Sequence, residues 1–312
     1  MVKCKICDDE FESEQSLHPH LRKHKIRIAE YYQKFFPRRD LFSGDLIKFK
    51  NKDYYFSTDF NSRPNMKRWL NDQSPKNARE YTKNLFQARV EKKKLKYSPT
   101  QVELRTVMFP PIQCLNLIHG NYYKFCSELN LENRFSDTLP LSKNCLSEKI
   151  SKDHLISVDS REQRPLKLSH PIEVRTLKFG DYTLDNPEAA SNCYIERKSL
   201  SDFIGTMSGG LDRFHKEIQK AEEAEAYVVV LVERNLNECS VFNRLPYVSK
   251  KIKATPEYIF RNVREIIQKY KSVQFLFVKG RKEASEITKK ILFSKGKCRD
   301  IDLQLAYDLK LL

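Results

Sequence analysis

The stretch Asn192-Cys-Tyr-Ile-Glu-Arg-Lys-Ser199 decides the fold class of this sequence. Its apolar and aromatic residues predict a strand, and Ser199 followed by Asp202 has the pattern of a helix capping box. Further strands are expected at residues 154–160, 172–179, 227–233 and 273–278. Helices are expected after Ser199 and around residues 211–221, 256–270 and 284–291. This alternation predicts an α/β domain at residues 151–312, with a mixed sheet flanked by helices.

Acidic residues are expected where three of these strands end. Asp159 and Glu162 follow the first strand, Gly180-Asp181 closes the second, and Glu196 lies on the third. Lys198 is two residues beyond Glu196 and therefore on the same face of its strand. Hydrolysis of a phosphodiester requires a hard divalent cation held by oxygen ligands, and a positive charge near the attacked phosphate. The pattern therefore predicts metal-dependent phosphodiester hydrolysis.

Three segments together resemble the XPF-type nuclease domain, whose signature is GDx(n)ERKxxxD. They are Asp159-Ser-Arg-Glu162, Leu177–Leu184 and Tyr194–Met207, and the resemblance covers about residues 155–280. It implies the restriction-endonuclease-like (PD-(D/E)xK) fold. It also implies a DNA endonuclease of DNA repair or DNA recombination that acts on branched, flapped or otherwise non-standard duplexes.

The resemblance implies a role for each residue of the site. The residues that it assigns to catalysis are Asp159, Glu162, Asp181, Glu196, Arg197, Lys198 and Asp202. Among them, Asp159, Asp181 and Glu196 are expected to bind Mg2+ or Mn2+. Glu162 is expected to support these ligands, and Lys198 to position or activate water.

Three further residues flank this centre in the family pattern. Arg197 is expected at the edge of the site, Asp202 is expected to brace it, and Arg213 is expected to bind the DNA backbone. Each pattern also has a simpler interpretation: Asp202 only caps its helix, and Arg197 is a surface ion-pair residue.

The sequence departs from the family in two ways. Many members carry a tandem helix-hairpin-helix module after the nuclease, which serves dimerisation and junction binding. About thirty residues follow the matched region here, and the glycines beyond Gly210 are Gly280 and Gly296, so these hairpins are not expected. No helicase segment is expected either, since no glycine-rich phosphate loop precedes a Lys-Ser/Thr pair. A preference for branched DNA, and assembly as a homodimer or with a partner subunit, are therefore left open by the sequence.

A Cys/His unit occupies residues 1–26. The predicted Zn2+ ligands are Cys4, Cys7, His20 and His24. Two residues separate the cysteines, three separate the histidines, and twelve separate the two pairs. A hairpin with the thiolates and a helical face with the imidazoles would complete a tetrahedral zinc shell. The unit resembles a C2H2 zinc finger, with Phe11 and Leu17 in its small core and His18 as an alternative ligand to His20.

The chain is strongly basic, with 57 Lys and Arg against 41 Asp and Glu and a formal net charge of +16. Such an excess favours DNA as a partner, because cations that contact phosphates release counterions. A lysine-rich surface from compositional bias is the alternative. Residues 27–150 interleave cations with aromatic side chains, which suits contacts with DNA phosphates and bases. The other interpretation of this basic accessory region is a small domain with an aromatic core.

No apolar run approaches the roughly 20 residues that span a bilayer, so no membrane is expected, and the first residues do not resemble a secretory signal. The eight cysteines are expected as thiols and metal ligands in a reducing intracellular compartment, either cytoplasm or nucleus.

The sequence thus predicts a zinc finger at 1–26, a basic accessory region at 27–150, and a nuclease domain at 151–312 that cuts DNA with Mg2+ or Mn2+. Two other functions fit parts of the pattern. One is a catalytically inactive DNA-binding scaffold, against which the complete set of acids with Lys198 argues. The other is a site-specific, homing-like endonuclease whose amino-terminal half reads sequence.

Overall fold

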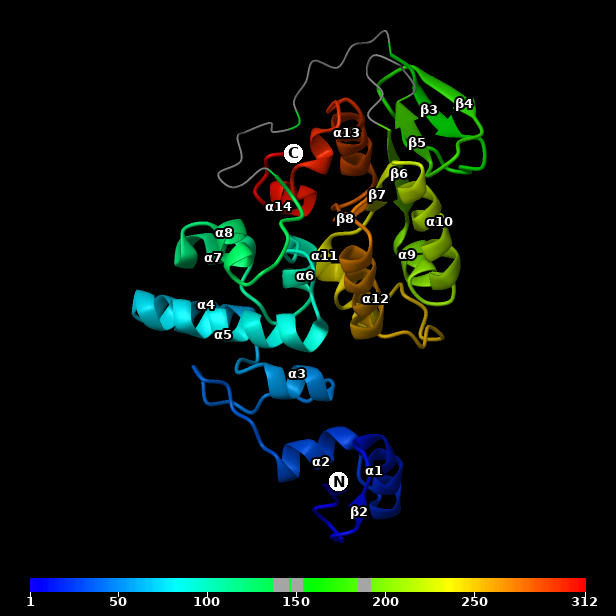
Figure 1. The fold of residues 1–312 in the computed structure, drawn as a ribbon. Coiled ribbons are helices and arrows are strands. Elements are labelled where there is room, and N and C mark those ends of the chain that lie inside the picture. Colours follow the sequence, from blue (N-terminus) through cyan, green and yellow to red (C-terminus); the bar gives the residue numbers. More distant parts are fainter. Residues whose placement is uncertain (137–145, 147–153, 185–191) are drawn as a thin grey trace. The chain divides into compact units, whose positions relative to one another are not determined.

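The computed structural model describes residues 1–136, 146, 154–184 and 192–312. These residues form two compact units (Figure 1). The first consists of Met1–Ala88 with Val107–Pro110, and the second of Arg89–Thr106 with Pro111–Leu312. The predicted boundary at residue 150 lies outside the described residues. The structure groups part of the predicted accessory region with the finger and the rest with the sheet.

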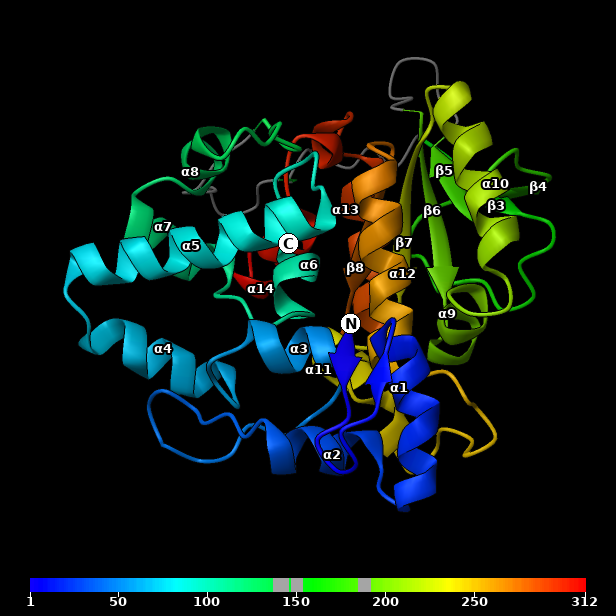
Figure 2. The same ribbon diagram turned by 60° about the horizontal axis from the view of Figure 1, so that its bottom comes forward.

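A six-stranded mixed sheet with the order β4-β3-β5-β6-β7-β8 forms the centre of the second unit. Its strands are β3 (Ile156–Asp159), β4 (Ile172–Arg175), β5 (Tyr182–Leu184), β6 (Cys193–Lys198), β7 (Tyr227–Val232) and β8 (Val273–Phe277). Strands β6, β7 and β8 are parallel and lie side by side (Figures 1 and 2), whereas β5 is antiparallel to both β3 and β6. The predicted α/β class is confirmed, and the mixed sheet flanked by helices is that of a restriction-endonuclease-like fold.

Alternate residues of the strands contribute to two apolar cores on opposite faces of the sheet. Val228, Val230 and Val232 of β7 belong to one core, and Val229 and Leu231 to the other. All of β7 is buried, as expected for a strand that is covered on both faces. The first face, called the α10 face, is covered by α9 (Leu200–Thr206), α10 (Leu211–Glu223) and α12 (Pro256–Lys269). The second, called the α13 face, is covered by α13 (Arg281–Leu292) and α14 (Leu303–Asp308).

One predicted strand was wrong in its extent. Residues 172–179 were expected as a single strand closed by Gly180-Asp181, but β4 ends at Arg175 and β5 is a separate strand on the other side of β3. The chain leaves the sheet after β4 because Leu177 is turned into the interior, where it is buried. Gly180, with a φ of +55°, then turns the chain into β5.

Helices that precede the sheet in sequence belong to the same unit. They are α6 (Gln101–Arg105), α7 (Ile112–His119) and α8 (Tyr122–Glu128), and short helices α11 (Leu236–Cys239), η2 (Phe242–Arg244) and η3 (Lys297–Arg299) lie between or after the strands. The buried guanidinium of Arg134 donates to the carbonyl oxygens of Ile267 and Tyr270, at 2.7 and 2.8 Å. These carbonyls lie where α12 ends, so Arg134 supplies partners that the helix itself cannot.

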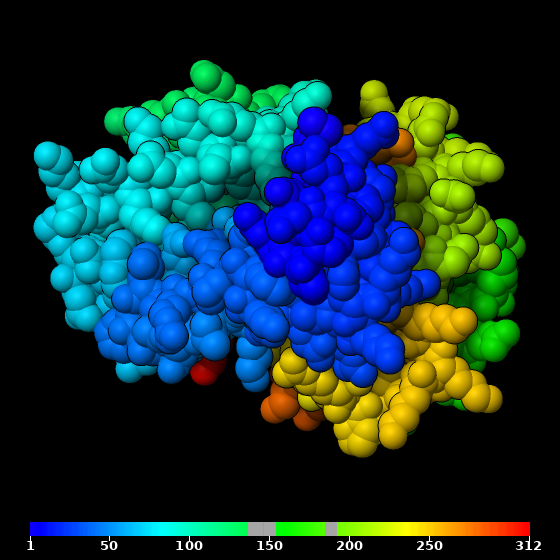
Figure 3. Space-filling model, turned by 90° about the horizontal axis from the view of Figure 1, so that it is seen from below, coloured from blue at the N-terminus to red at the C-terminus, as the bar shows by residue number. Residues whose placement is uncertain are grey.

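The first unit contains a β-hairpin followed by helices. Its elements are β1 (Val2–Lys3), β2 (Glu10–Phe11), α1 (Glu14–His20), η1 (Leu21–His24), α2 (Ile28–Phe35), α3 (Lys52–Ser57), α4 (Arg63–Asp72) and the first part of α5 (Pro75–Lys93). One core joins Leu17 and Leu21 of the finger to Tyr31 and Tyr32 of α2 and to Tyr55 of α3. The aromatic residues that follow the finger therefore form a core, as one of the two interpretations of this region expected. Figure 3 shows part of the surface of this unit, coloured from blue at residue 1 towards cyan at Ala88.

Candidate active site and metal centre

Strand β6 presents successive side chains to opposite faces of the sheet. Glu196 and Lys198 pair in register with Val230 and Val232 of β7, two residues of the core on the α10 face. Glu196 and Lys198 therefore lie on the α10 face, and Arg197 between them lies on the α13 face. The Lys198 ammonium donates to Glu196 Oε1 at 2.8 Å and lies 5.8 Å from the centre of the Phe214 ring of α10.

Gly180 allows Asp181 to lie directly beside Glu196. The Asp181 N–H donates to the Ile195 carbonyl oxygen at 2.7 Å, which places Asp181 opposite Glu196 across the β5–β6 ladder. A Cβ atom on Gly180 would lie 2.8 Å from that same oxygen, and the φ of +55° is unfavourable for other residues. The glycine of the Gly-Asp pair is thus required by the close approach of β5 to β6.

Asp181 and Glu196 form a pair of adjacent carboxylates. Burial, and next the negative charge of Glu196, raise the pKa of Asp181 to about 7. The Arg197 N–H donates to Asp181 Oδ2 at 2.7 Å and fixes the orientation of this carboxylate. Two oxygen donors whose charges repel each other fit a hard divalent cation, which removes the repulsion and accepts carboxylate ligands.

Asp159 lies next to this pair but its carboxylate has other partners. Its N–H donates to the Asp181 carbonyl oxygen at 2.8 Å, so the two residues are neighbours across β3 and β5. Arg161 binds both carboxylate oxygens, at 2.7 and 2.9 Å, and the Leu177 N–H donates to Oδ2 at 2.8 Å. The hydrogen bond from Arg161 is the first reason why the pKa of Asp159 is lowered to about 2. The structure therefore brings Asp181 and Glu196 together, while the Asp159 carboxylate is paired with Arg161.

Arg197 and Glu162 meet in a buried ion-pair network on the α13 face. The Arg197 guanidinium donates to both oxygens of Glu162, at 2.9 and 3.0 Å, and to Glu233 at 3.1 Å. Arg281, at the start of α13, donates to Glu233 at 3.1 Å. Only 5% of the Glu162 side chain and 11% of the Arg197 side chain are exposed. The Arg197 side chain thus pairs inside the unit and does not form a surface ion pair.

Three residues of this region were not singled out from the sequence. Arg161 is one residue before Glu162, inside the quoted segment, and only the loop conformation directs it to Asp159. Glu233 ends the apolar run of β7, and its position at a strand end was a signal that the sequence offered. Arg281 is 48 residues from Glu233, and no spacing in the sequence connects them.

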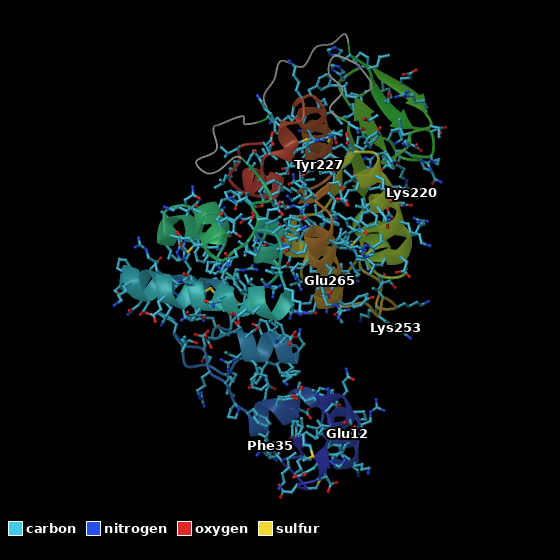
Figure 4. The ribbon with its side chains drawn as sticks, in the orientation of Figure 1. Glu12, Phe35, Lys220, Tyr227, Lys253 and Glu265 are labelled. Carbon is cyan, nitrogen blue, oxygen red and sulfur yellow. The ribbon has the colours of Figure 1, made fainter. Side chains whose placement is uncertain are left out.

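Asp202 and Arg213 lie on the surface of α9 and α10, two of the three helices that cover the α10 face. The Ser199 hydroxyl donates to Asp202 Oδ2 at 2.6 Å and accepts from the Asp202 N–H at 3.2 Å. These contacts are those of a helix cap. The Arg213 side chain is 80% exposed and lies 3.4 Å from Glu217. Lys220, labelled in Figure 4, lies two turns further along the same helix.

The finger gathers four possible metal ligands. Among the described residues, the group of three or more Cys, His, Asp or Glu side chains that could hold a metal ion is Cys4, Cys7, His20 and His24. Their ligand atoms all lie within 4.8 Å of one another, with Cys7 Sγ 3.2 Å from His20 Nε2. His18 is not part of this group, since its Nε2 lies 3.1 Å from the Tyr32 hydroxyl. Two thiolates and two imidazoles fit tetrahedral Zn2+.

Comparison with known proteins assigns the sheet to a family. Residues 158–291 match the ERCC4 domain family, so the second unit contains an XPF-type nuclease domain. The matched residues include both carboxylates of the pair, Lys198 and the ion-pair network around Arg197. Members of this family are nucleases.

Two solved structures resemble the chain. XPF from Aeropyrum pernix has 18% sequence identity and a TM-score of 0.32, over 44% of this chain and 64% of that chain. XPF from the same organism in complex with DNA has 20% identity and a TM-score of 0.33, over 45% of this chain and 63% of that chain. The similar region is thus less than two thirds of each of those chains. No curated protein matches this chain. Among the described residues, no helix has the length and apolarity to cross a membrane.

Proposed function

We propose that this protein is a divalent-metal-dependent DNA endonuclease that hydrolyses phosphodiester bonds in branched, flapped or otherwise non-standard duplex DNA. The observation that carries the proposal is the carboxylate pair of Asp181 and Glu196 with Lys198 on the same face, inside an ERCC4 domain. A purely structural role would not favour two adjacent carboxylates, one of which has a pKa raised by burial and by the charge of the other.

The residues of the α10 face divide the chemistry between them. Asp181 and Glu196 would hold Mg2+ or Mn2+, which lowers the pKa of bound water and neutralises charge on the phosphate. Glu196 accepts one hydrogen bond from the Lys198 ammonium, at 2.8 Å. The other N–H groups of Lys198 are then able to hydrogen-bond to an attacking water or to a phosphate oxygen. Lys198 is buried beside the Phe214 ring, where a positive charge is worth more than in water.

The remaining predicted residues would act on this pair from outside it. Glu162 fixes the side chain of Arg197, whose main-chain N–H holds Asp181. Asp159 would reach a metal ion only after Arg161 releases it. Asp202 would hold the start of α9 through Ser199, and exposed Arg213 would contact the DNA backbone.

We further propose that the finger binds Zn2+ and that the first unit contributes to DNA binding. Zn2+ at Cys4, Cys7, His20 and His24 would supply folding energy to a segment too small to fold alone. Glu12 lies just before the finger helix (Figure 4) and disfavours base recognition by its start. Arg22, Lys23 and Lys25, which are exposed at its other end, suit contacts with phosphates.

A cleavage panel tests this function. The purified chain is incubated with Mg2+ or Mn2+ and with plain, nicked, flapped and four-way DNA. Asp181→Asn and Glu196→Gln should abolish cleavage and leave DNA binding near normal, because each removes a ligand charge and almost no volume. Glu265→Gln is the matched control, since Glu265 is exposed on α12 and its ion pair is with Arg261, at 3.9 Å.

The panel also separates the other two functions. A catalytically inactive scaffold would bind the branched DNA and cut none of it under either metal. A homing-like enzyme would cut one preferred site in random duplexes and ignore branching. Cleavage that persists at more than a few per cent in both carboxylate variants would remove the proposed site.

A further inference from the structure

A cleft of about 790 Å³ lies in the second unit, apart from the carboxylate pair. Its walls come from α6, α11, α13, α14 and the end of β8. Neither Asp181 nor Glu196 lines the cleft, whose apolar residues come from both cores: Leu236 and Phe277 from the α10 face and Ile287 from the α13 face. The nuclease chemistry proposed above therefore does not account for it.

The acidic side chains of the cleft already have hydrogen-bond or ion-pair partners. Asp308 accepts from Arg105 at 2.6 and 2.7 Å, and also from Gln304 at 3.0 Å. Glu283 accepts from the Lys279 N–H at 3.1 Å and from the Tyr307 hydroxyl. Glu286 pairs with Lys289 at 2.8 Å. A cationic ligand would have to displace one of these partners.

The lysines of the cleft are available instead. Lys282 and Lys290 lie eight residues apart on α13, on the same side of the helix, and Lys310 approaches from the segment after α14. Within the part of the chain that the structure describes, none of the three ammonium groups has a hydrogen bond or an ion pair. Counted against them are the carboxylate of Leu312, which also lines the cleft, and that of Glu283, whose two hydrogen-bond partners carry no charge, so an excess of one positive charge remains. The cleft therefore favours an anion.

The floor of the cleft is apolar. Leu236, Phe277 and Ile287 line it and belong to the buried interior of the unit. A bare phosphate would contact only the lysines, whereas a ligand with a flat, weakly polar part would also rest on this apolar floor. A volume of about 790 Å³ exceeds what a phosphate alone requires and is within the range of small-molecule sites.

We propose that this cleft binds a nucleotide, with its phosphate at Lys282, Lys290 and Lys310 and its base against Leu236, Phe277 and Ile287. The same chemistry is offered by a free nucleotide and by one unit of a single DNA strand. Binding here is independent of the carboxylate pair, so it does not require hydrolysis.

The test measures binding by calorimetry to the full chain without added Mg2+ or Mn2+. The probes are adenosine monophosphate, adenosine, inorganic phosphate and a single-stranded oligothymidylate. The triple variant Lys282→Gln, Lys290→Gln, Lys310→Gln should weaken binding of adenosine monophosphate about tenfold or more, as expected for the loss of several charge-assisted contacts. Replacing the same three lysines with arginine should retain it.

The control variant is Lys124→Gln, Lys253→Gln, Lys269→Gln, which changes the charge equally at exposed sites outside the cleft. It should leave the affinity within about twofold, since distant surface charges are screened. If only the oligothymidylate binds and the cleft variant weakens it, the ligand is a DNA strand and the proposal holds. Equal binding of inorganic phosphate and adenosine monophosphate would overturn the role of the apolar floor. Equal effects of the cleft and control variants would overturn the site.

Discussion

Gly180→Ala should damage both the stability of the second unit and cleavage. Gly180 has a φ of +55°, and an added Cβ would lie 2.8 Å from the Ile195 carbonyl oxygen. The left-handed backbone costs an alanine about 1–2 kcal/mol. The contact adds roughly 1–3 kcal/mol, because the opposing atom is main chain and no side chain can rotate away. The free energy of unfolding should therefore fall by about 2–5 kcal/mol in total.

Cleavage should fall further than stability predicts. The main-chain atoms that the new Cβ would push apart are those that place Asp181 beside Glu196, through the bond from Asp181 N to Ile195 O at 2.7 Å. Misplacement of a catalytic group by about 1 Å costs on the order of a hundredfold in rate. We therefore expect kcat to fall at least tenfold at a temperature where the variant is still folded.

Gly205→Ala provides the matched control for this prediction. Gly205 lies in α9, and an added Cβ would meet no atom within 4 Å. The substitution should be neutral or stabilise the protein by up to about 1 kcal/mol, because alanine favours the helix. Denaturant unfolding and single-turnover cleavage on one flapped substrate measure both variants. Wild-type stability and kcat in Gly180→Ala would refute the reasoning.

Four further predictions follow from contacts of the described residues. Lys198→Ala should cost about 2–4 kcal/mol in kcat/KM with little loss of stability. Arg197→Ala should instead lower the free energy of unfolding by roughly 3–5 kcal/mol, because it leaves buried Glu162 unpaired. Cleavage and denaturation assays distinguish the two variants, and small, equal effects of both would contradict the assignment. Cys4→Ser should release Zn2+ in elemental analysis and leave basal cleavage in place; unchanged metal content would remove the finger site. Burial raises the pKa of Asp302 from 3.8 to about 6, so its contribution to stability is present below pH 3.8 and is lost as pH rises through 6; thermal unfolding of Asp302→Asn between pH 4 and 7 should lack this decline. A fragment of residues 89–312 should unfold cooperatively. A fragment of residues 151–312 should not, because it lacks Arg134 and the Gln101 N–H that donates to Asp302 at 2.6 Å. Equal melting curves of the two fragments would show that these contacts are dispensable.

Patterns within one element were readable from the sequence. The β6 stretch, the cap at Ser199 and the buried run of β7 depend on neighbours a few residues apart, and the structure confirms all three. The grouping of His20 with the two cysteines, without His18, likewise follows from local spacing.

Patterns between elements were not readable in the same way. The alternation along β6 predicts that the Arg197 side chain lies on the opposite face of the sheet from those of Glu196 and Lys198. It does not predict that Glu162 and Glu233 lie on the same face as Arg197. The position of Glu233 follows from the pairing of β6 with β7, and that of Glu162 from a loop after β3. The contact between Arg134 and the end of α12 leaves no periodic pattern in the sequence, because a single guanidinium and a few main-chain carbonyl groups form it.

The two faces of β6 explain why the Glu-Arg-Lys order cannot be permuted. The α13 face requires a planar guanidinium, which binds both oxygens of Glu162 and still reaches Glu233. The α10 face requires a compact ammonium that can bind Glu196 at 2.8 Å and keep other protons for a second partner. Arg197 also joins the faces, because its N–H holds Asp181 while its side chain holds the network. The ion-pair network therefore contributes to the geometry of the carboxylate pair without touching it, through the main chain of a single residue.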